Sequence, residues 1–288
     1  INYDNNYYRK ESIIRTNMSR NNCNNNNNPV IIKDDEFDKD EYVVNIIHDL
    51  RSHVNVILSA EQIMEHSIDE SKEETKYLEM IRRSSYKMLK LINNIIDTDR
   101  LGNDYYILNK QNTEIVSLLE NTIGEIAKYA AKRNINLIFD TNEEECEVVI
   151  DSDAIDRVLM NLLSNAIKFS NDDSNIYINL YVAENEVSFS VKDEGCGISK
   201  DEIDKIFNRF YQATKARNSF SGSGIGLNLS YYLVKAHGGN IIIKSELNKG
   251  SEFKVILPRS EEKPGKTIEN KNLEGLSEKI EIEFSDIQ

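Results

Sequence analysis

Tryptophan, proline and cysteine are scarce in the sequence. It has no Trp, three Pro and only three Cys among 288 residues. Cys23, Cys146 and Cys196 are odd in number, and their spacing is not that of a metal site. A disulfide framework and a zinc site are therefore not expected. This cysteine usage fits a reducing cytosol.

Cationic residues are also scarce relative to acidic ones. The chain has 35 Lys and Arg against 49 Asp and Glu, which gives a formal net charge of −14. Proteins that bind nucleic acids hold the phosphate backbone with stripes of Lys and Arg. We therefore expect no nucleic-acid partner. Any phosphorylated ligand must instead meet cations that are gathered locally.

Long apolar runs are missing as well. No stretch approaches the roughly 18 apolar residues that read as a membrane-spanning helix. There is no signal-peptide pattern, and the sequence starts at Ile1 without a methionine. We interpret the sequence as the cytoplasmic portion of a longer protein. In this interpretation, attachment to the cell membrane comes only through an N-terminal part that is missing here.

The first hundred residues divide into two segments. Residues 1–35 are Asn-rich and cannot bury enough apolar surface to fold, so we expect a disordered linker. In residues 36–102, apolar residues recur at spacings of three and four, which predicts one helix from Phe37, a loop at Ser67–Glu74, and a second helix over about Thr75–Arg100. An antiparallel hairpin of this kind should dimerise into a four-helix bundle. The alternative is a monomeric hairpin packed on the next domain.

From residue 103 to 258 the pattern alternates between strands and helices, which predicts an α+β sandwich. Strands are expected at 105–108, 136–140, 147–150, 176–183, 187–193, 240–245 and 252–257. Helices are expected at 115–133, 153–169 and 226–236. Residues 259–288 form an acidic tail, expected to be loose. The alternation of Ile280, Ile282 and Phe284 leaves a docked strand open there.

Two glycine clusters and a pair of amides suggest a nucleotide site. The clusters are Asp193-Glu-Gly-Cys-Gly197 and Gly222-Ser-Gly-Ile-Gly226. Upstream, Asn161 and Asn165 are one helical turn apart and therefore share a face. The combination offers an acid for a base edge, amides for a metal and glycines for phosphates.

These motifs resemble, in order and spacing, the four boxes of histidine-kinase ATPase domains. The boxes are Asn161-x-x-x-Asn165-Ala-Ile-Lys168-Phe169, Asp193-x-Gly195-x-Gly197, Phe207-x-x-Phe210 and Gly222-x-Gly224-x-Gly226-Leu227. The region from Phe37 to about Arg100 resembles the dimerisation and histidine-phosphotransfer domain of the same family. The likeness covers about 35–258. It implies a Bergerat-type ATP-binding domain behind a helical hairpin, with ATP and Mg²⁺ as cofactors.

The resemblance assigns a role to each box. Asn165 is the principal Mg²⁺ ligand and Asn161 a helper, and amide oxygens suit such a hard cation. Lys168 would meet a phosphate as a point charge, and Phe169 would lie against adenine. Asp193 would accept a hydrogen bond from the adenine amino group.

The glycines would bring the backbone close to the ligand. Gly195 and Gly197 allow a tight turn beneath the base. Gly222, Gly224 and Gly226, followed by Leu227, precede a helix whose free N–H groups would face phosphate. In the lid between the clusters, Arg209 is our candidate for a γ-phosphate contact. The other lid residues are expected to serve as solvated charge or as lid anchors: Lys215, Arg217, Phe207 and Phe210.

The phosphoacceptor box of the family resembles His48-Asp49-Leu-Arg-Ser52. A neutral imidazole, with a pKa of about 6.5, can attack phosphorus, and Asp49 would orient the ring and take its proton. Ser52 stands where a hydroxyl or amide supports phosphatase activity in many relatives. His53 replaces a proline that relatives often carry, which predicts a straighter first helix.

The sequence therefore predicts a homodimeric histidine autokinase that phosphorylates His48 and passes the phosphoryl group to the receiver domain of a response regulator. One alternative is a dimeric module that binds nucleotide without turnover, or a relative that acts mainly as a phosphatase. Another is an ATPase of the gyrase, chaperone or mismatch-repair kind. The last group lacks a hairpin with His-Asp, so residues 36–102 argue against it.

Overall fold

The structure, a computed structural model, describes residues 50, 52–57, 59–60, 63, 71–102, 107–212, 223–259 and 273–287. The statements below concern these residues. The predicted linker, and the predicted acceptor pair His48 and Asp49, lie outside them.

The hairpin region is helical where it is described. Residues 50, 52–57, 59–60 and 63 are helical, and α2 spans Ser71–Gly102. The second helix thus starts four residues before the predicted Thr75 and ends two residues after the predicted Arg100. Among the described residues, no helix combines the length and the apolar character needed to cross a membrane.

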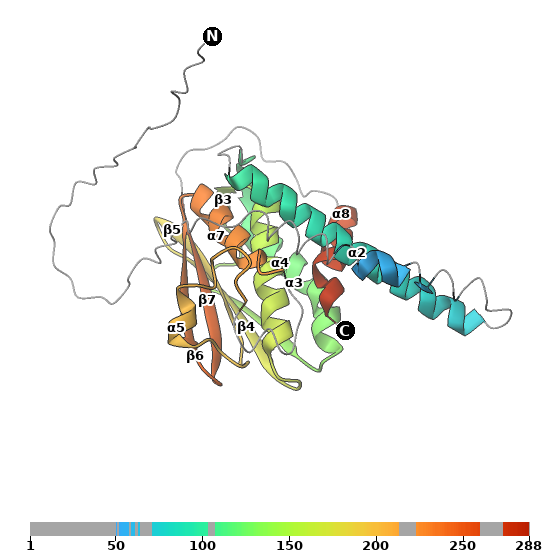
Figure 1. Cartoon of the computed structure of the whole chain (residues 1–288). Helices are drawn as coiled ribbons and strands as arrows, with labels where there is room; N and C mark the ends of the chain where they lie inside the picture. Colours follow the sequence, from blue (N-terminus) through green and yellow to red (C-terminus); the bar gives the residue numbers. More distant parts are fainter. Residues whose placement is uncertain are drawn as a thin grey trace, which may run out of the picture. The chain divides into compact units, whose positions relative to one another are not determined.

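A five-stranded mixed sheet carries the second domain (Figure 1). Its strands are β2 (Asn136–Thr141), β4 (Asn175–Val182), β5 (Glu186–Lys192), β6 (Asn240–Glu246) and β7 (Gly250–Pro258). They lie in the order β2-β4-β5-β7-β6, with only the β2–β4 pair parallel. In the middle of the sheet, Phe189 of β5 pairs with Leu180 on one side and Val255 on the other.

Three helices pack together against the sheet: α3 (Ile115–Ala131), α4 (Ser152–Phe169) and α7 (Gly226–Ala236). The α3 helix starts at Glu114, whose carboxylate accepts hydrogen bonds from the backbone N–H of Val116 and Ser117. The α4 helix starts at Asp151, which accepts from Ala154. The core lies between this helical layer and the sheet, where buried Ile, Leu, Val and Phe side chains meet. The predicted α+β sandwich is confirmed.

Two differences from the predicted elements lie within the ATPase-like domain. Of the strand predicted at 105–108, residues 107–108 have no regular structure and 105–106 lie outside the described residues; β1 spans Gln111–Glu114. It pairs antiparallel with β3 (Glu147–Ile150) in a separate two-stranded sheet. A short helix that was not predicted, α5 (Lys200–Ile203), follows the first glycine cluster.

The C-terminal segment is the larger correction. Residues Leu273–Glu283 form a helix, α8, followed by a 3₁₀ turn, η1 (Phe284–Asp286), so the open possibility of a strand here is wrong. Ile280 of α8 and Phe284 of η1, four residues apart, are both fully buried. The alternation of Ile280, Ile282 and Phe284 suggested a strand with all three on its buried face, but Ile282 is only half-buried.

Candidate active site

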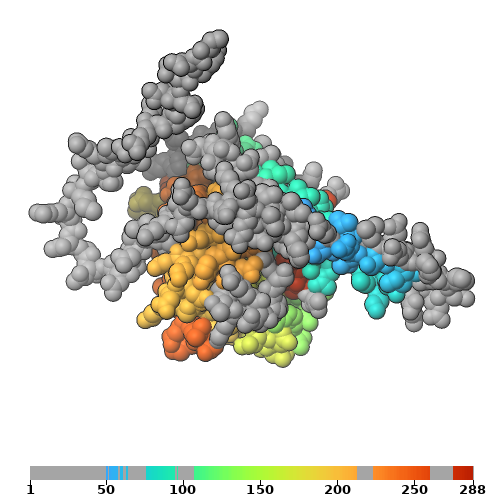
Figure 2. All heavy atoms as spheres, viewed as in Figure 1, coloured from blue at the N-terminus to red at the C-terminus, as the bar shows by residue number. Residues whose placement is uncertain are grey.

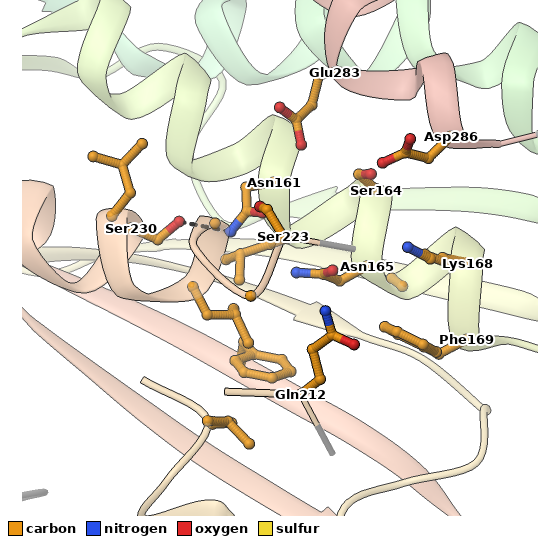
Figure 3. Close-up of a pocket in the computed structure, with 18 of the residues that line it drawn as sticks. Asn161, Ser164, Asn165, Lys168, Phe169, Gln212, Ser223, Ser230, Glu283 and Asp286 are labelled. Carbon is orange, nitrogen blue, oxygen red and sulfur yellow. Dashed lines mark hydrogen bonds between the residues drawn. The ribbon is translucent and has the colours of Figure 1, made fainter. Parts of the chain in front are cut away.

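A cavity of about 430 Å³ lies where the predicted boxes meet. Its walls come from α4, the two glycine segments, strands β5 and β7, helix α7 and, from outside the ATPase-like domain, the hairpin and the C-terminal segment. Figure 3 shows the close-up, with the side chains of α4 on one side and Ser223 and Gln212 opposite. Most of the predicted site residues therefore share one space.

Asp193 lines the cavity directly after β5 and is buried. Its Oδ1 accepts hydrogen bonds from the backbone N–H of Gly195 at 2.8 Å and of Ser251 at 3.3 Å. Burial raises the pKa of Asp193, although these two hydrogen bonds act in the opposite direction. Both bonds use the same oxygen, so the carboxylate is fixed in orientation by the backbone.

The turn after Asp193 requires the second glycine of its cluster, Gly197. Gly197 has φ +63°, and a Cβ there would lie 2.0 Å from the carbonyl oxygen of Glu246. Both the left-handed backbone and the close approach exclude a larger residue. Gly195 does not line the cavity; it packs against the Phe169 carbonyl behind it. The backbone of this turn therefore packs closely against the end of β6 and the end of α4.

The two amides of α4 have different surroundings. Asn161 is buried, and its Nδ2 donates a hydrogen bond of 2.8 Å to the hydroxyl of Ser230 on α7. Asn165, one turn later, is half-buried and points into the cavity toward Ser223 and Gln212 (Figure 3). The sequence paired these residues correctly on one face. Only the structure separates a residue that holds α7 in place from one that faces the open space.

Lys168 and Phe169 close the same side of the cavity. The Lys168 ammonium lies 5.8 Å from the centre of the Phe169 ring, within range of a cation–π contact. Burial lowers the pKa of Lys168, while the nearby carboxylate of Asp286 acts to raise it. Lys168 is thus a buried cation at the cavity wall, as expected for a group that meets an anion.

The beginning of α7 faces the cavity through Gly224, Gly226 and Leu227. A Cβ at Gly226 would lie 2.2 Å from Oδ1 of Asn161, so the helix starts directly against the amide. The first N–H groups of a helix attract anions. Gly222 lies outside the described residues, as do Lys215 and Arg217.

Other predicted residues lie elsewhere. Among the described residues, Arg209 is not part of the cavity wall; its guanidinium lies 5.9 Å from the ring centre of Tyr232. In contrast, Ser52 and His53 of the first hairpin helix do line the cavity. Phe207 is fully buried against α7, where its carbonyl accepts a hydrogen bond from Asn228, which agrees with a role as a lid anchor.

Comparison with known proteins agrees with this geometry. Residues 150–261 match the family model described as histidine kinase-, DNA gyrase B-, and HSP90-like ATPase. Over 223 residues, 77% of this chain, the sequence is 30% identical to the sensor histidine kinase YvrG of Bacillus subtilis (strain 168). The match covers 38% of YvrG, so the chain spans well under half the length of this relative.

The chain belongs to the histidine kinases. The solved structure of full-length ShkA in complex with AMPPNP matches 77% of this histidine kinase chain and 46% of its own, with a TM-score of 0.59 and 22% identity. The histidine kinase ThkA in complex with the response regulator TrrA matches 76% of the chain and 61% of its own, with a TM-score of 0.57 and 22% identity. At these identities the two structures establish a common fold.

The histidine kinase has cavity residues that sequence reasoning missed. Glu283 and Asp286 of the C-terminal segment, and Lys87, Lys90 and Asn94 of α2, line the cavity beside α4. They belong to no box of the family. Lys90 and Glu283 are separated by 193 residues in the sequence, and no local pattern links the two positions. The only available signal was the apolar periodicity of residues 280–284, which indicated docking without its location.

Proposed function

We propose that the chain is the catalytic part of a sensor histidine kinase that phosphorylates His48 with Mg²⁺-ATP. The observation that carries the proposal is that one cavity gathers Asp193, Asn165 and Lys168 together with Ser52 and His53 of the hairpin. His48 precedes Ser52 by four residues in the sequence. Donor site and acceptor helix therefore meet at the same space.

In this proposal the nucleotide lies along the cavity. The oriented carboxylate of Asp193 accepts a hydrogen bond from the adenine amino group, and Phe169 lies beside the ring. The phosphates then reach the start of α7 at Gly224–Gly226 and the ammonium of Lys168. Phosphoryl transfer needs mainly positioning and charge neutralisation, and these groups supply both.

The residues at the far end suit a divalent cation. Neutral amide oxygens are good ligands for Mg²⁺, which keeps several waters and binds substrate phosphates at the same time. Asn165 points into the cavity and is the residue that we expect to hold the ion. Bound there, Mg²⁺ would neutralise charge on the β- and γ-phosphates. Asn161 supports α7 through its hydrogen bond to Ser230.

At the acceptor, a nitrogen lone pair of the neutral His48 imidazole attacks the γ-phosphorus. The bond between this phosphorus and the β,γ-bridging oxygen breaks, ADP leaves, and Asp49 takes the ring proton. The phosphoryl group then passes from His48 to an aspartate of a receiver domain. The similar kinase ThkA was crystallised with a response regulator, which supports a partner of this class.

The kinase is proposed to act as a homodimer formed by the hairpin. On α2, Leu78, Leu89, Ile92 and Ile96 are all at least 41% exposed in the single chain. At 3.6 residues per turn they fall on one side of the helix. We call this set the apolar stripe of α2. A second hairpin that covers it would complete a four-helix bundle.

Autophosphorylation is tested with ATP labelled on the γ-phosphate. The unmodified chain should acquire label that is lost in acid and kept in base, as expected for a phosphorylated imidazole. His48→Ala should abolish this label, whereas the control His66→Ala, outside the phosphoacceptor box, should retain it. Acid-labile label that persists in His48→Ala rejects the acceptor.

The same assay separates the alternative functions. Normal nucleotide binding without any label would favour a binding module that does not turn over. Ser52 lines the cavity, so its variant Ser52→Ala should be assayed with a phosphorylated receiver domain. Faster loss of phosphate from the receiver in the presence of the unmodified chain, and not of Ser52→Ala, would indicate phosphatase activity.

A further inference from the structure

The C-terminal segment 273–287 connects the hairpin to the ATPase domain; we call it the C-terminal strap. Its apolar residues Ile280, Phe284 and Ile287 are buried. The ring of Phe284 lies 5.0 Å from that of Tyr129 on α3. The strap contacts α2, α3 and α4, and in Figure 2 its red surface is visible beside the turquoise surface of α2. It is therefore packed into the molecule.

The polar side of the strap binds a basic stripe of α2, formed by Arg83, Lys87 and Lys90. The Lys90 ammonium donates to the Glu283 carbonyl at 2.6 Å and to Oδ2 of Asp286 at 3.1 Å, and lies 3.3 Å from Oε1 of Glu283. Arg83 donates to the Ser285 carbonyl at 3.0 Å. Lys87 lies 3.9 Å from Asp286. Such half-buried, charge-assisted bonds are stronger than exposed ion pairs.

These contacts place two carboxylates at the proposed phosphate end of the cavity. Glu283 and Asp286 line it together with Lys87, Lys90 and Lys168. Figure 3 shows both carboxylates extending toward the face of α4 that carries Asn161, Ser164, Asn165 and Lys168. The strap therefore lies where the triphosphate and its metal are expected.

The charges of this cluster are strongly coupled. Burial acts to raise the pKa of Asp286, but the cations Lys90 and Lys168 outweigh it and hold the pKa below its ordinary value. Burial acts to lower the pKa of Lys90, and the carboxylates of Glu283 and Asp286 more than compensate. The strap thus gives three lysines at the cavity an anionic environment without any phosphate.

We propose that the C-terminal strap is an autoinhibitory element whose Glu283 and Asp286 compete with the phosphates of the nucleotide for the lysines of the cavity. The proposal rests on the proposed function, because it takes ATP as the ligand. Phosphates that enter repel the two carboxylates and displace them from Lys90 and Lys168. Release of the strap also frees the basic stripe of α2, and so loosens the hairpin from the ATPase domain.

The two binding events are then coupled with negative sign, and the coupling is reciprocal. Removal of the carboxylates should strengthen nucleotide binding, and nucleotide should loosen the strap. Couplings of this kind are typically about 5- to 150-fold in affinity. A ligand without phosphates should show no coupling, since it brings no negative charge toward the carboxylates of Glu283 and Asp286.

The first test is a calorimetric titration with AMP-PNP in the presence of Mg²⁺. Glu283→Gln combined with Asp286→Asn should bind at least about fivefold more tightly than the unmodified chain. A control that also removes two charges, Glu278→Gln with Glu120→Gln, should bind like the unmodified chain, because both side chains are exposed. Adenosine should bind all forms alike.

The outcomes separate the two proposals. Equal or weaker binding of AMP-PNP by the strap variant overturns the inhibitory role of the strap and leaves the proposed kinase function unaffected. An equal gain for adenosine also overturns it, because the effect would not lie at the phosphates. Absence of AMP-PNP binding in every form overturns both proposals.

A second measurement uses the unmodified chain and does not depend on the folding of a variant. Backbone amide exchange of 280–287 should become faster when AMP-PNP and Mg²⁺ bind, and should not change with adenosine. Slower or unchanged exchange at saturating AMP-PNP overturns the strap as a competitor.

Discussion

At the scale of single residues, the domain contains a buried carboxylic acid outside the site. Asp156 of α4 is buried and accepts a hydrogen bond of 2.7 Å from the hydroxyl of Thr122 on α3. Burial raises its pKa to about 6, although the Thr122 bond and the charge of Lys279 act to lower it. The ordinary value for an aspartate is about 3.9. Asp156 therefore keeps its proton in the folded state at pH values where the unfolded chain has lost it.

The sign of the pH effect follows. Between about pH 4 and pH 6 the folded state binds more protons than the unfolded one, so stability falls as the pH rises. Asp156→Asn removes this dependence. Relative to the unmodified chain, its free energy of unfolding should rise by about 2 kcal/mol between pH 4.5 and pH 7.5. Urea unfolding at the two pH values measures this difference. Asp140→Asn, at an exposed position, should show no such change.

Replacement of the two amide residues of α4 should have different effects. Asn165→Ala removes a side chain that faces the cavity, so we expect loss of Mg²⁺-dependent nucleotide binding with little change in stability. Asn161→Ala also leaves the buried Ser230 hydroxyl without its donor, which costs about 1–3 kcal/mol. Thermal melting and nucleotide titration of both variants test this. Equal destabilisation by the two variants would contradict the assigned roles.

At the scale of elements, the start of α7 depends on a single glycine. Gly226→Ala would bring a methyl group within 2.2 Å of the Asn161 amide oxygen and push it from its place between the helices. We expect at least about a tenfold loss in nucleotide affinity, equivalent to about 1.4 kcal/mol. The matched control is Gly124→Ala in α3, where a Cβ meets nothing within 4 Å. It should stabilise the helix by about 0.5–1 kcal/mol and leave binding unchanged.

The elements that the sequence predicted well are those with a strong local signature. Strand β3, helix α7 and the β4–β5 hairpin lie within a residue or two of the predicted ranges, because apolar periodicity and turn residues bound them on both sides. The site residues Asn161, Asn165 and Asp193 were found because their spacing is local. Neither argument reaches Glu283 or Asp286, whose partners on α2 are nearly 200 residues away in the sequence. The strand left open at 280–284 is absent for a related reason: tertiary contacts with α3 and α2 favour the helix.

At the scale of the whole molecule, α2 has two opposed sides. The basic stripe (Arg83, Lys87 and Lys90) binds the strap, and the apolar stripe (Leu78, Leu89, Ile92 and Ile96) lies on the other side of the helix. The strap consequently leaves the proposed dimer surface uncovered. Strap docking and dimer formation can take place on the same helix.

The proposed dimer is tested on the apolar stripe. Leu89→Glu combined with Ile92→Glu places charges in the seam of the bundle and should convert dimers to monomers. The control is Met80→Glu, because Met80 is 40% exposed on a different side of α2. Sedimentation equilibrium of the three proteins at matched concentrations gives the association state. Dimers that persist in the double variant would show that another surface holds the protomers together.

The opposed stripes make α2 a mechanical link. An α-helix transmits rotation along its length as a stiff rod, so a twist imposed at the bundle seam must turn the lysines through the same angle. The ion pairs at Lys90 hold only over short distances, between 3.1 and 3.3 Å for the side-chain contacts. A modest rotation of α2 about its axis would therefore break the ion pairs between Lys90 and the strap. In the proposed dimer, α2 would therefore link rotation at the dimer surface to release of the strap in each protomer.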